Sequence, residues 1–242
     1  MKRLLVLLGF LLLPANLSAH ASAVDFSKWA VLIVAGDNRA QSGGPTQVFD
    51  NARKDLVKAF TGAGFAAANI EQFAVNHDNS ARPAEIGSIA GVLWDLSSRA
   101  PAGCLIYFTS HGTPDGIGVG NAVVSPGKVA AMINNSCGDK PAVIVMSACY
   151  SGQFVPVLAR DSRIVITAAR PDRTSFGCGE LDQLTYFDDC FLRAMPKAED
   201  FAGLGGLVQQ CVTFREKQMK AEPPSEPQVS VGPQVAFTLR WK

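Results

Sequence analysis

Four short runs of mainly apolar residues recur along this chain, and each is followed by small or polar residues. The stretches between them carry apolar residues at helical spacing. Apolar β-branched runs of this length, bounded by Pro or Gly, are typical of strands buried on both faces of a parallel sheet. Alternation of such strands with helices predicts an α/β domain of three layers (α-β-α), with a mostly parallel sheet and helices on both faces. The four runs are 29–34, 104–108, 142–146 and 163–167.

The remaining segments fit the same architecture. Apolar residues at 49, 52, 56 and 60 share one helical face, and Gly62 and Gly64 end that helix. Segment 220–234 is rich in Pro and polar residues, which predicts an extended surface segment, and 235–241 is a candidate edge strand. We also expect a short strand at 70–75 and helices at 86–96, 126–133, 184–191 and 201–211.

The N-terminus has the pattern of a secretory signal. Lys2 and Arg3 precede an apolar block, residues 4–13, and small residues flank candidate cleavage positions after Pro14. The block is too short to span a bilayer comfortably. We therefore expect residues 1–23 to be a cleaved signal peptide and residues 24–242 to form one domain. The protein would be periplasmic or extracellular, with no membrane attachment after cleavage.

Composition excludes several functional classes. The formal net charge is only +1, with 48% hydrophobic and 18% charged residues, so the chain has material for a core and no implied nucleic-acid partner. No dinucleotide-binding GxGxxG, Walker loop or GxSxG elbow is present. The six cysteines show no CxxC pair, and nothing in the sequence requires a metal or a cofactor. The sequence leaves disulfide connectivity and oligomeric state open.

Two of the expected strands end in residues that can carry chemistry. His111 follows the run at 104–108, and Cys149 follows the run at 142–146. In a parallel sheet both ends lie at one edge, about 5 Å apart per strand spacing. Taken alone, Cys149 could be a small core residue and His111 a polar loop residue. Together they favour a thiol nucleophile with an imidazole base.

Glycine and small residues around this pair strengthen the interpretation. The backbone N–H of Gly112, free of side-chain obstruction, could form an oxyanion hole with the N–H of Cys149. A helix that begins near Ser151 would direct its positive end at the thiolate.

Four segments together resemble the legumain-like cysteine peptidases, within the wider caspase and haemoglobinase group. They are an apolar strand ending in Ser-His-Gly (105–112), an apolar strand ending in Ala-Cys-x-Ser-Gly (143–152), the Ala-Gly-x-Asn sequence at 35–38, and the segment 166–175. The order, His before Cys by about forty residues, also matches. The N-terminal pattern suggests a secreted member of bacterial type.

The resemblance implies a role for each matching residue. Cys149 would be the nucleophile, His111 the general acid and base, and Asn38 the residue that orients the histidine. Gly112 and Cys149 would supply the oxyanion N–H groups. The large legumain insertions and the C-terminal prodomain are absent from this sequence, so the resemblance does not imply activation by prodomain removal.

The resemblance also implies a peptide or protein substrate. Legumains favour asparagine, and sometimes aspartate, before the scissile bond, and an acidic residue two positions before the nucleophile forms part of that pocket. Here that position is Ser147, a departure from the asparagine-selective pattern. Thr174, Ser175 and Asp188 align with other pocket residues and are the further candidates for substrate binding.

Other functions remain open at this stage. The main hypothesis is an endopeptidase that forms a Cys-His acyl-enzyme. A transpeptidase or transamidase would use the same acyl-enzyme, and a non-catalytic binding protein could keep the fold without turnover. A thiol-redox role is disfavoured by the lack of CxxC. The second mature histidine, His77, is followed by Asp78 and is interpreted as part of a surface turn.

Overall fold

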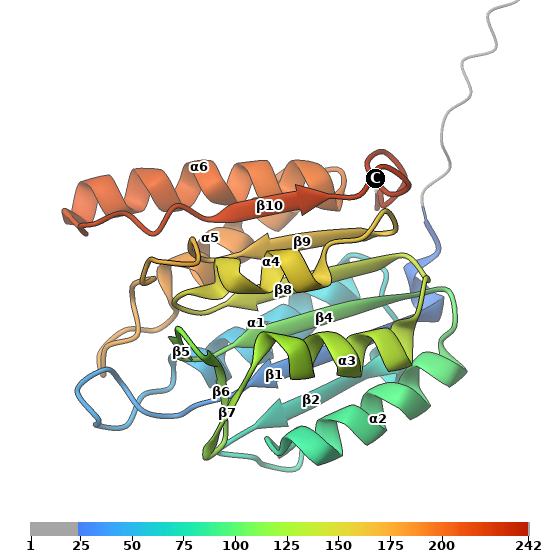
Figure 1. Cartoon of the computed structure of the whole chain (residues 1–242), viewed down its shortest axis with the longest axis horizontal. Coiled ribbons are helices and arrows are strands. Elements are labelled where there is room, and N and C mark those ends of the chain that lie inside the picture. The colour runs from blue at the N-terminus through green and yellow to red at the C-terminus, as the bar shows by residue number, and fades with distance from the viewer. Residues whose placement is uncertain (1–23, 242) are drawn as a thin grey trace, which may run out of the picture.

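A seven-stranded sheet forms the centre of the protein, as the computed structural model of residues 24–241 shows (Figure 1). The strand order is β10-β9-β8-β4-β1-β2-β3; β10 is antiparallel to its neighbour and the other pairings are parallel. The strands are β1 (Trp29–Ala35), β2 (Ile70–Ala74), β3 (Arg82–Pro83), β4 (Gly103–Thr109), β8 (Ala142–Ser147), β9 (Arg163–Thr167) and β10 (Gln228–Val231).

Helices cover both faces of this sheet, which confirms the expected three-layer α/β architecture. Alternate residues of the central strands face opposite layers: Leu32 and Ile106 pack with α2 and α3, while Ile33 and Leu105 pack with α1, α5 and α6. Every residue of β1, β4 and β8 is buried, which explains their unbroken apolar sequences. The helices are α1 (Val48–Gly62), α2 (Ile86–Arg99), α3 (Pro126–Cys137), α4 (Val155–Leu158), α5 (Tyr186–Ala194) and α6 (Phe201–Met219).

One sequence-based expectation about the C-terminal part was wrong. Residues 235–241 do not form an edge strand; the edge strand is β10, within the extended segment 220–234. Val229 of β10 packs against Gly205 of α6, where an added Cβ would approach it to 2.9 Å. The Pro-rich composition masked this strand because β10 occupies only four residues between prolines.

A small second sheet lies beside the main one and follows His111 directly. Its strands are β5 (Gly112–Thr113), β6 (Gly116–Val119) and β7 (Ala122–Val124), paired antiparallel. The glycine-rich segment at 116–120 is therefore largely in β6. Its Gly116 has a φ of +151°, and a Cβ there would meet the carbonyl oxygen of Val124 at 2.1 Å.

The direction in which successive strands are added to the sheet reverses between the parallel neighbours β1 and β4. From β1 the chain continues to β2 and β3 on one side; from β4 it continues to β8 and β9 on the other. Open α/β sheets bind ligands outside the carboxyl ends of their strands at such a point. The residues that follow β1, β4 and β8 therefore meet at the edge where a site is expected.

Two disulfides, Cys104–Cys137 and Cys190–Cys211, join β4 to the end of α3 and α5 to α6. Cys149 and Cys178 are free.

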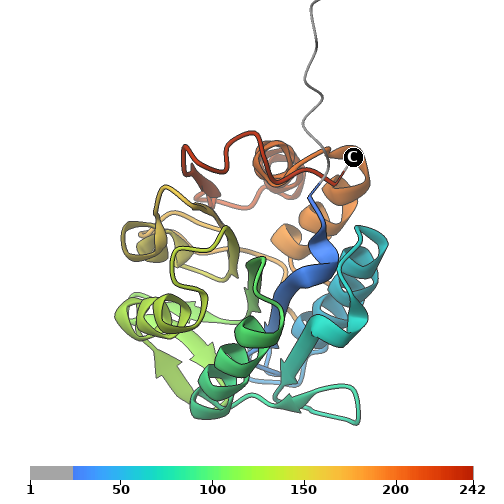
Figure 2. The same ribbon diagram turned by 90° about the vertical axis from the view of Figure 1, so that its right-hand side faces the viewer.

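The two ends of the described chain lie side by side (Figure 2), and the N–H of Val24 donates to the carbonyl of Arg240 at 3.0 Å. The expected signal peptide, residues 1–23, lies outside the described residues. Within residues 24–241, none of the helices has the length and apolar character needed to span a bilayer.

Candidate active site

His111 is held directly after the end of β4. The N–H of Ser110 donates to the carbonyl of Ser147 at 3.1 Å, which continues the β4–β8 pairing up to the histidine. The imidazole ring stands edge-on to Phe49 of α1, with 5.1 Å between ring centroids. Its Nε2 lies 2.7 Å from the carbonyl oxygen of Arg39, in the loop that follows β1. Three separate elements thus fix the position and rotation of this ring.

The bond to Arg39 also determines which ring nitrogen carries the proton. A carbonyl oxygen can only accept a hydrogen bond, so Nε2 of His111 must be the donor. In the neutral ring the lone pair then resides on Nδ1. His111 therefore presents a basic nitrogen on the side of the ring away from Arg39.

Cys149 lies in a tight turn after β8. Tyr150 adopts a left-handed conformation with φ of 56°, unusual for a residue with a side chain, and its N–H donates to the carbonyl of Arg173 at 2.7 Å. The N–H of Ser175 donates to Sγ of Cys149 at 3.2 Å. The sulfur is thus half-exposed and oriented by backbone from the 170–178 loop.

The small residues after Tyr150 make this turn possible. Buried Ser151 accepts a hydrogen bond on its Oγ from the N–H of Ala169 at 3.1 Å. At Gly152, a Cβ would lie 2.5 Å from Pro171, so only glycine fits. The expected helix start is here, but it consists of one 3₁₀ turn, Ser151–Phe154, followed by the four-residue α4. So short a segment has little macrodipole, and the expected helix-dipole contribution is not part of this site.

Gly112 brings the two halves together. An added Cβ at Gly112 would lie 2.0 Å from the carbonyl oxygen of Cys149 and 3.1 Å from its nitrogen. The backbone of Gly112 and the backbone of Cys149 are therefore in direct contact. His111 and Cys149 line one cavity of about 310 Å³, as the pairing of strand ends indicated.

The walls of this cavity, here named the Cys149 cavity, come from four segments. Two of the sequence-based substrate candidates, Thr174 and Ser175, line it. Its lining carries no Lys, Arg, Asp or Glu. The full lining is Gln41, His111, Gly112, Cys149, Tyr150, Thr174, Ser175, Phe176 and Cys178.

The other two substrate candidates, Ser147 and Asp188, do not line the cavity. Ser147 is 2% exposed, and Asp188 of α5 is fully buried below it. The carboxylate of Asp188 accepts hydrogen bonds from the hydroxyls of Tyr107 at 2.7 Å and Thr109 at 2.6 Å. Burial raises the pKa of Asp188 above its usual value, although these bonds oppose the shift. The expectation that Ser147 and Asp188 contact substrate is therefore wrong. Both residues are buried and lie outside the cavity lining.

Asn38 also differs from its expected role. Its side-chain amide donates to the side-chain oxygen of Asn76 at 2.7 Å, which ties the loop after β1 to the loop after β2. The group that contacts the histidine is the backbone carbonyl of the next residue, Arg39. The sequence pattern indicated a side chain as the partner of the histidine and could not indicate a backbone acceptor. Cavity-lining Gln41, Phe176 and Cys178 were also missed, because they come from loops without a recognisable pattern.

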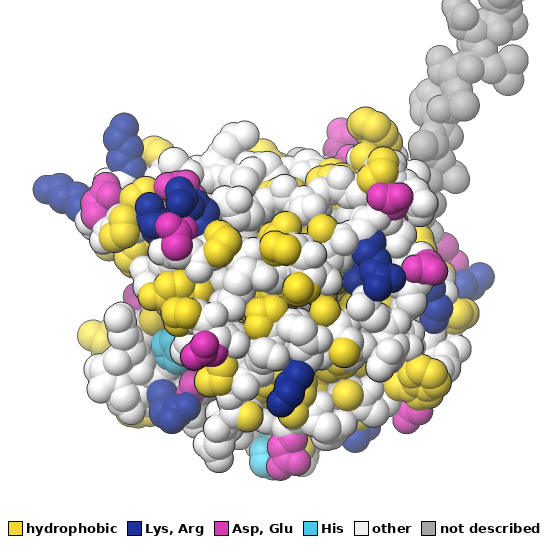
Figure 3. All heavy atoms as spheres, viewed as in Figure 1, with side chains coloured by type: hydrophobic (Ala, Val, Ile, Leu, Met, Phe, Trp, Pro, Cys, Tyr) yellow, Lys and Arg dark blue, Asp and Glu magenta, His cyan; other side chains and the backbone are white. Residues whose placement is uncertain are grey.

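On the face shown in Figure 3, basic and acidic side chains are interspersed among uncharged ones. Among residues 24–241 there is no cluster of three or more His, Cys, Asp or Glu with the arrangement of a metal site.

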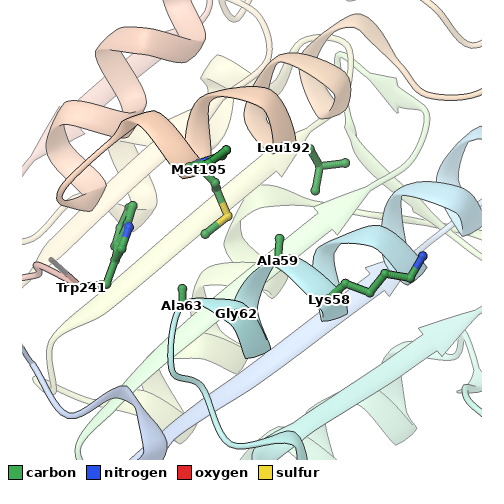
Figure 4. A pocket seen from close by; sticks show the side chains of 8 residues that line it. Lys58, Ala59, Gly62, Ala63, Leu192, Met195 and Trp241 are labelled. Atoms are coloured by element: carbon green, nitrogen blue, oxygen red, sulfur yellow. The ribbon is translucent and has the colours of Figure 1, made fainter.

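A second, larger cavity of about 440 Å³ lies between α1, the C-terminal end of α5 and Trp241 near the C-terminus (Figure 4). Its walls include Leu192, Met195 and Trp241, and Lys58 reaches past its rim. It is lined by no cysteine, histidine or carboxylate, and Lys58 is the one ionisable group among its lining residues. We refer to it as the Trp241 cavity.

Comparison with known proteins identifies the family. The crystal structure of caspase-1 from Spodoptera frugiperda is similar in fold, with a TM-score of 0.61 and 14% identity over 88% of this chain and 89% of that one. No curated protein sequence matches the chain. The sequence profile of the peptidase C13 family matches residues 85–217, more than half of the chain, including both the His111 and the Cys149 segments. The chain therefore belongs to the peptidase C13 family of legumain-like cysteine peptidases.

Proposed function

We propose that this protein is a cysteine endopeptidase in which Cys149 and His111 cleave peptide bonds through an acyl-enzyme. The observation that carries the proposal is the shared cavity: a free thiol and an imidazole with an available Nδ1 line it together. The packing of Gly112 against the backbone of Cys149 brings the residue that follows His111 next to the proposed nucleophile.

The first half of the reaction follows from these positions. Sγ of Cys149 gives its proton to Nδ1 of His111 and attacks the carbonyl carbon of the scissile bond. The resulting oxyanion is stabilised by the N–H groups of Gly112 and Cys149. The imidazolium then protonates the leaving amine as the C–N bond breaks, which leaves a thioester on Cys149.

The second half uses the same groups in reverse. His111 takes a proton from water, and the hydroxide attacks the thioester carbonyl. The C–S bond breaks, the carboxylic acid product leaves, and Cys149 regains its proton. The hydrogen bond from Nε2 of His111 to the Arg39 carbonyl supports both steps, because it stabilises the ring when it is charged.

The cavity lining supports a preference for an uncharged residue before the scissile bond. A buried charged side chain needs an ion partner, and the lining offers none. The hydroxyls of Thr174 and Ser175 and the amide of Gln41 can instead hydrogen-bond a neutral polar side chain. This preference would not need an acid at the Ser147 position.

Export of the protein is part of the same proposal. The N-terminal pattern supports it, and so do the two disulfides, which persist in oxidising compartments. N-terminal sequencing of the protein recovered from the cell exterior or periplasm tests this; a new N-terminus near residue 24 is expected, and an intact Met1 would contradict it.

The test of the reaction uses purified mature protein with fluorogenic peptides that differ only in the residue before the scissile bond. We expect cleavage after neutral polar residues and little after Asp, Glu, Lys or Arg. Cys149→Ala and His111→Ala should each lose at least about 1,000-fold in kcat. His77→Ala changes an exposed histidine outside the cavity and should leave kcat unchanged.

Two outcomes would contradict the proposal. One is no cleavage of any peptide together with iodoacetamide alkylation of Cys149 no faster than that of a free thiol. The other is full turnover in Cys149→Ala. Mass spectrometry of the products with an added amine separates hydrolysis from acyl transfer by the same intermediate.

A further inference from the structure

Asp37 follows β1 and is only 7% exposed, although it carries a charge. Its Oδ1 accepts hydrogen bonds from the N–H of Asn38 at 2.8 Å and of Arg39 at 3.0 Å. The Arg39 guanidinium adds two more, Nε to Oδ1 and Nη2 to Oδ2, each at 3.0 Å. Burial alone would raise the pKa of Asp37, but these bonds outweigh it and keep the pKa below 3.8. The carboxylate is therefore ionised at neutral pH and can accept all four bonds.

The bonds to backbone matter more than the ion pair. The Arg39 side chain is 57% exposed, and exposed ion pairs contribute little. The two backbone bonds, in contrast, fix the two peptide groups that precede the Arg39 carbonyl. On the other side, the N–H of Ala40 donates to the carbonyl of Gly44 at 2.7 Å. The Arg39 carbonyl is thus held from both sides as it accepts the bond from His111.

The geometry points to Asp37 as a positioning residue for His111: by closing the turn at 37–39 it aims the Arg39 carbonyl at Nε2 and so selects the tautomer with its lone pair on Nδ1. Asp37 does not line the Cys149 cavity, so it acts through Arg39 and not on substrate. Asn38 cannot replace it, because its side chain is bonded to Asn76. The effect on turnover rests on the proposed function, whereas the effect on the imidazole tautomer does not.

The same strand provides a matched control. Asp25 lies just before β1, and its Oδ1 accepts the N–H of Ser27 at 3.1 Å, a turn two residues long like that of Asp37. Nothing reactive depends on that turn. Asp25→Ala removes a comparable carboxylate from the opposite end of β1.

The test measures ¹⁵N NMR spectra of histidine-labelled protein for wild type, Asp37→Ala, Asp37→Asn and Asp25→Ala. His111→Gln assigns the signals. In wild-type protein, at a pH where the imidazole of His111 is neutral, we expect the ring ¹⁵N shifts of the Nε2–H tautomer. Asp37→Ala should give mixed-tautomer shifts, and Asp37→Asn should recover part of the wild-type signature because an amide oxygen still accepts the backbone bonds. Asp25→Ala should match wild type.

Turnover provides the second readout. Asp37→Ala should lower kcat by about 10- to 100-fold with little change in KM, since the ring is misplaced and substrate contacts are intact. Asp37→Asn should lie between Asp37→Ala and wild type. Asp25→Ala should keep the wild-type values.

The outcomes separate the two proposals. Wild-type tautomer shifts in folded Asp37→Ala would overturn the positioning role, whatever the activity. A changed tautomer in Asp37→Ala, with a wild type that cleaves no peptide, would support the positioning role and contradict the peptidase. If Asp37→Ala does not fold, the result for Asp37→Asn decides. Ring ¹⁵N shifts between the two tautomers would support the positioning role, and wild-type shifts with a wild-type kcat would overturn it.

Discussion

The Cys149 cavity and the Trp241 cavity are similar in size but differ in how they are built. The Cys149 cavity, about 310 Å³, lies where loops after parallel strands meet, and backbone groups contact one another at its base. The Trp241 cavity, about 440 Å³, lies between helices and has mainly apolar side-chain walls. The larger cavity has neither a cysteine nor a histidine in its lining, so volume alone does not locate the candidate site in this protein.

The difference has a physical reason. Strand ends present backbone N–H and C=O groups in fixed directions, and a nucleophile needs such donors around the developing charge. Helices satisfy their own backbone groups internally, so a space between them offers mainly side chains. Changes in the two cavities should therefore affect different properties: catalysis in one, stability in the other.

The largest effect should come from adding one methyl group at Gly112, beside the Cys149 cavity. Gly112→Ala places a Cβ 2.0 Å from the Cys149 carbonyl oxygen, so the two strand ends must separate and the oxyanion donors move. We expect kcat to fall by at least about 100-fold. The measurement is steady-state cleavage of the best peptide from the panel.

Gly62→Ala is the matched control in the Trp241 cavity. A Cβ at Gly62 has no atom within 4 Å, and Gly62 is the last residue of α1. We expect unchanged kcat and a small gain in stability, about 0.5 kcal/mol, from the stiffer unfolded chain. Equal kcat in Gly112→Ala and Gly62→Ala would contradict the difference between the cavities.

A second prediction compares the two free thiols within the Cys149 cavity. Burial raises the pKa of Cys178 to about 11, and the neighbouring Cys149 adds to the shift. Since only the thiolate reacts, roughly one Cys178 in a thousand is reactive at pH 8. A brief native pulse of iodoacetamide, followed by peptide mass mapping, should label Cys149 and leave Cys178 unlabelled until the protein is denatured.

Raising the pH sharpens this prediction. Labelling of Cys178 should increase about tenfold for each pH unit up to about pH 11. In Cys149→Ser it should remain slow at pH 8, because burial is the main cause. Labelling of Cys178 as fast as that of Cys149 at pH 8 would contradict the raised pKa of Cys178.

Met195→Ala should change stability and not catalysis. Met195 is 4% exposed and lines the Trp241 cavity, so truncation enlarges a space that already exists. We expect a loss of about 2 kcal/mol in the free energy of unfolding, measured by urea titration, with kcat unchanged. A fall in kcat without loss of stability would show that the Trp241 cavity serves the reaction.

Asp188→Asn should have the smallest effect, and it should depend on pH. Burial raises the pKa of Asp188, so the native state holds its proton above pH 3.8 while the unfolded chain does not. The stability from this proton is fully present below pH 3.8 and is lost as pH rises through the native pKa. Asp188→Asn does not titrate, so its stability relative to wild type should rise across that range.

Urea titrations of both proteins from pH 4 to pH 8 measure this difference. A constant difference would mean that Asp188 titrates alike in the native and unfolded states. The hydroxyls of Tyr107 and Thr109 limit the effect, because they stabilise the ionised form.

Much of the fold was predictable because its signals are local. The fully buried strands at 29–35, 103–109 and 142–147 can only be continuous apolar runs, and they were recognised as such. The strand β10 was not, because three of its four residues are half-buried and one is exposed, and they pair with β9 across about sixty positions of sequence. Its neighbour in sequence, 235–241, has a more apolar pattern but forms no strand.

The sequence by itself determined the layered architecture and the placement of His111 and Cys149 at the ends of neighbouring strands, because periodic burial and strand-end position are recorded in residue order. Tertiary structure alone decided what surrounds them. That His111 is oriented by the Arg39 carbonyl, and that Asp188 lies buried beneath the cavity, depends on backbone groups and long-range packing. Every residue has the same carbonyl, so no pattern of side chains can reveal which one a histidine will meet.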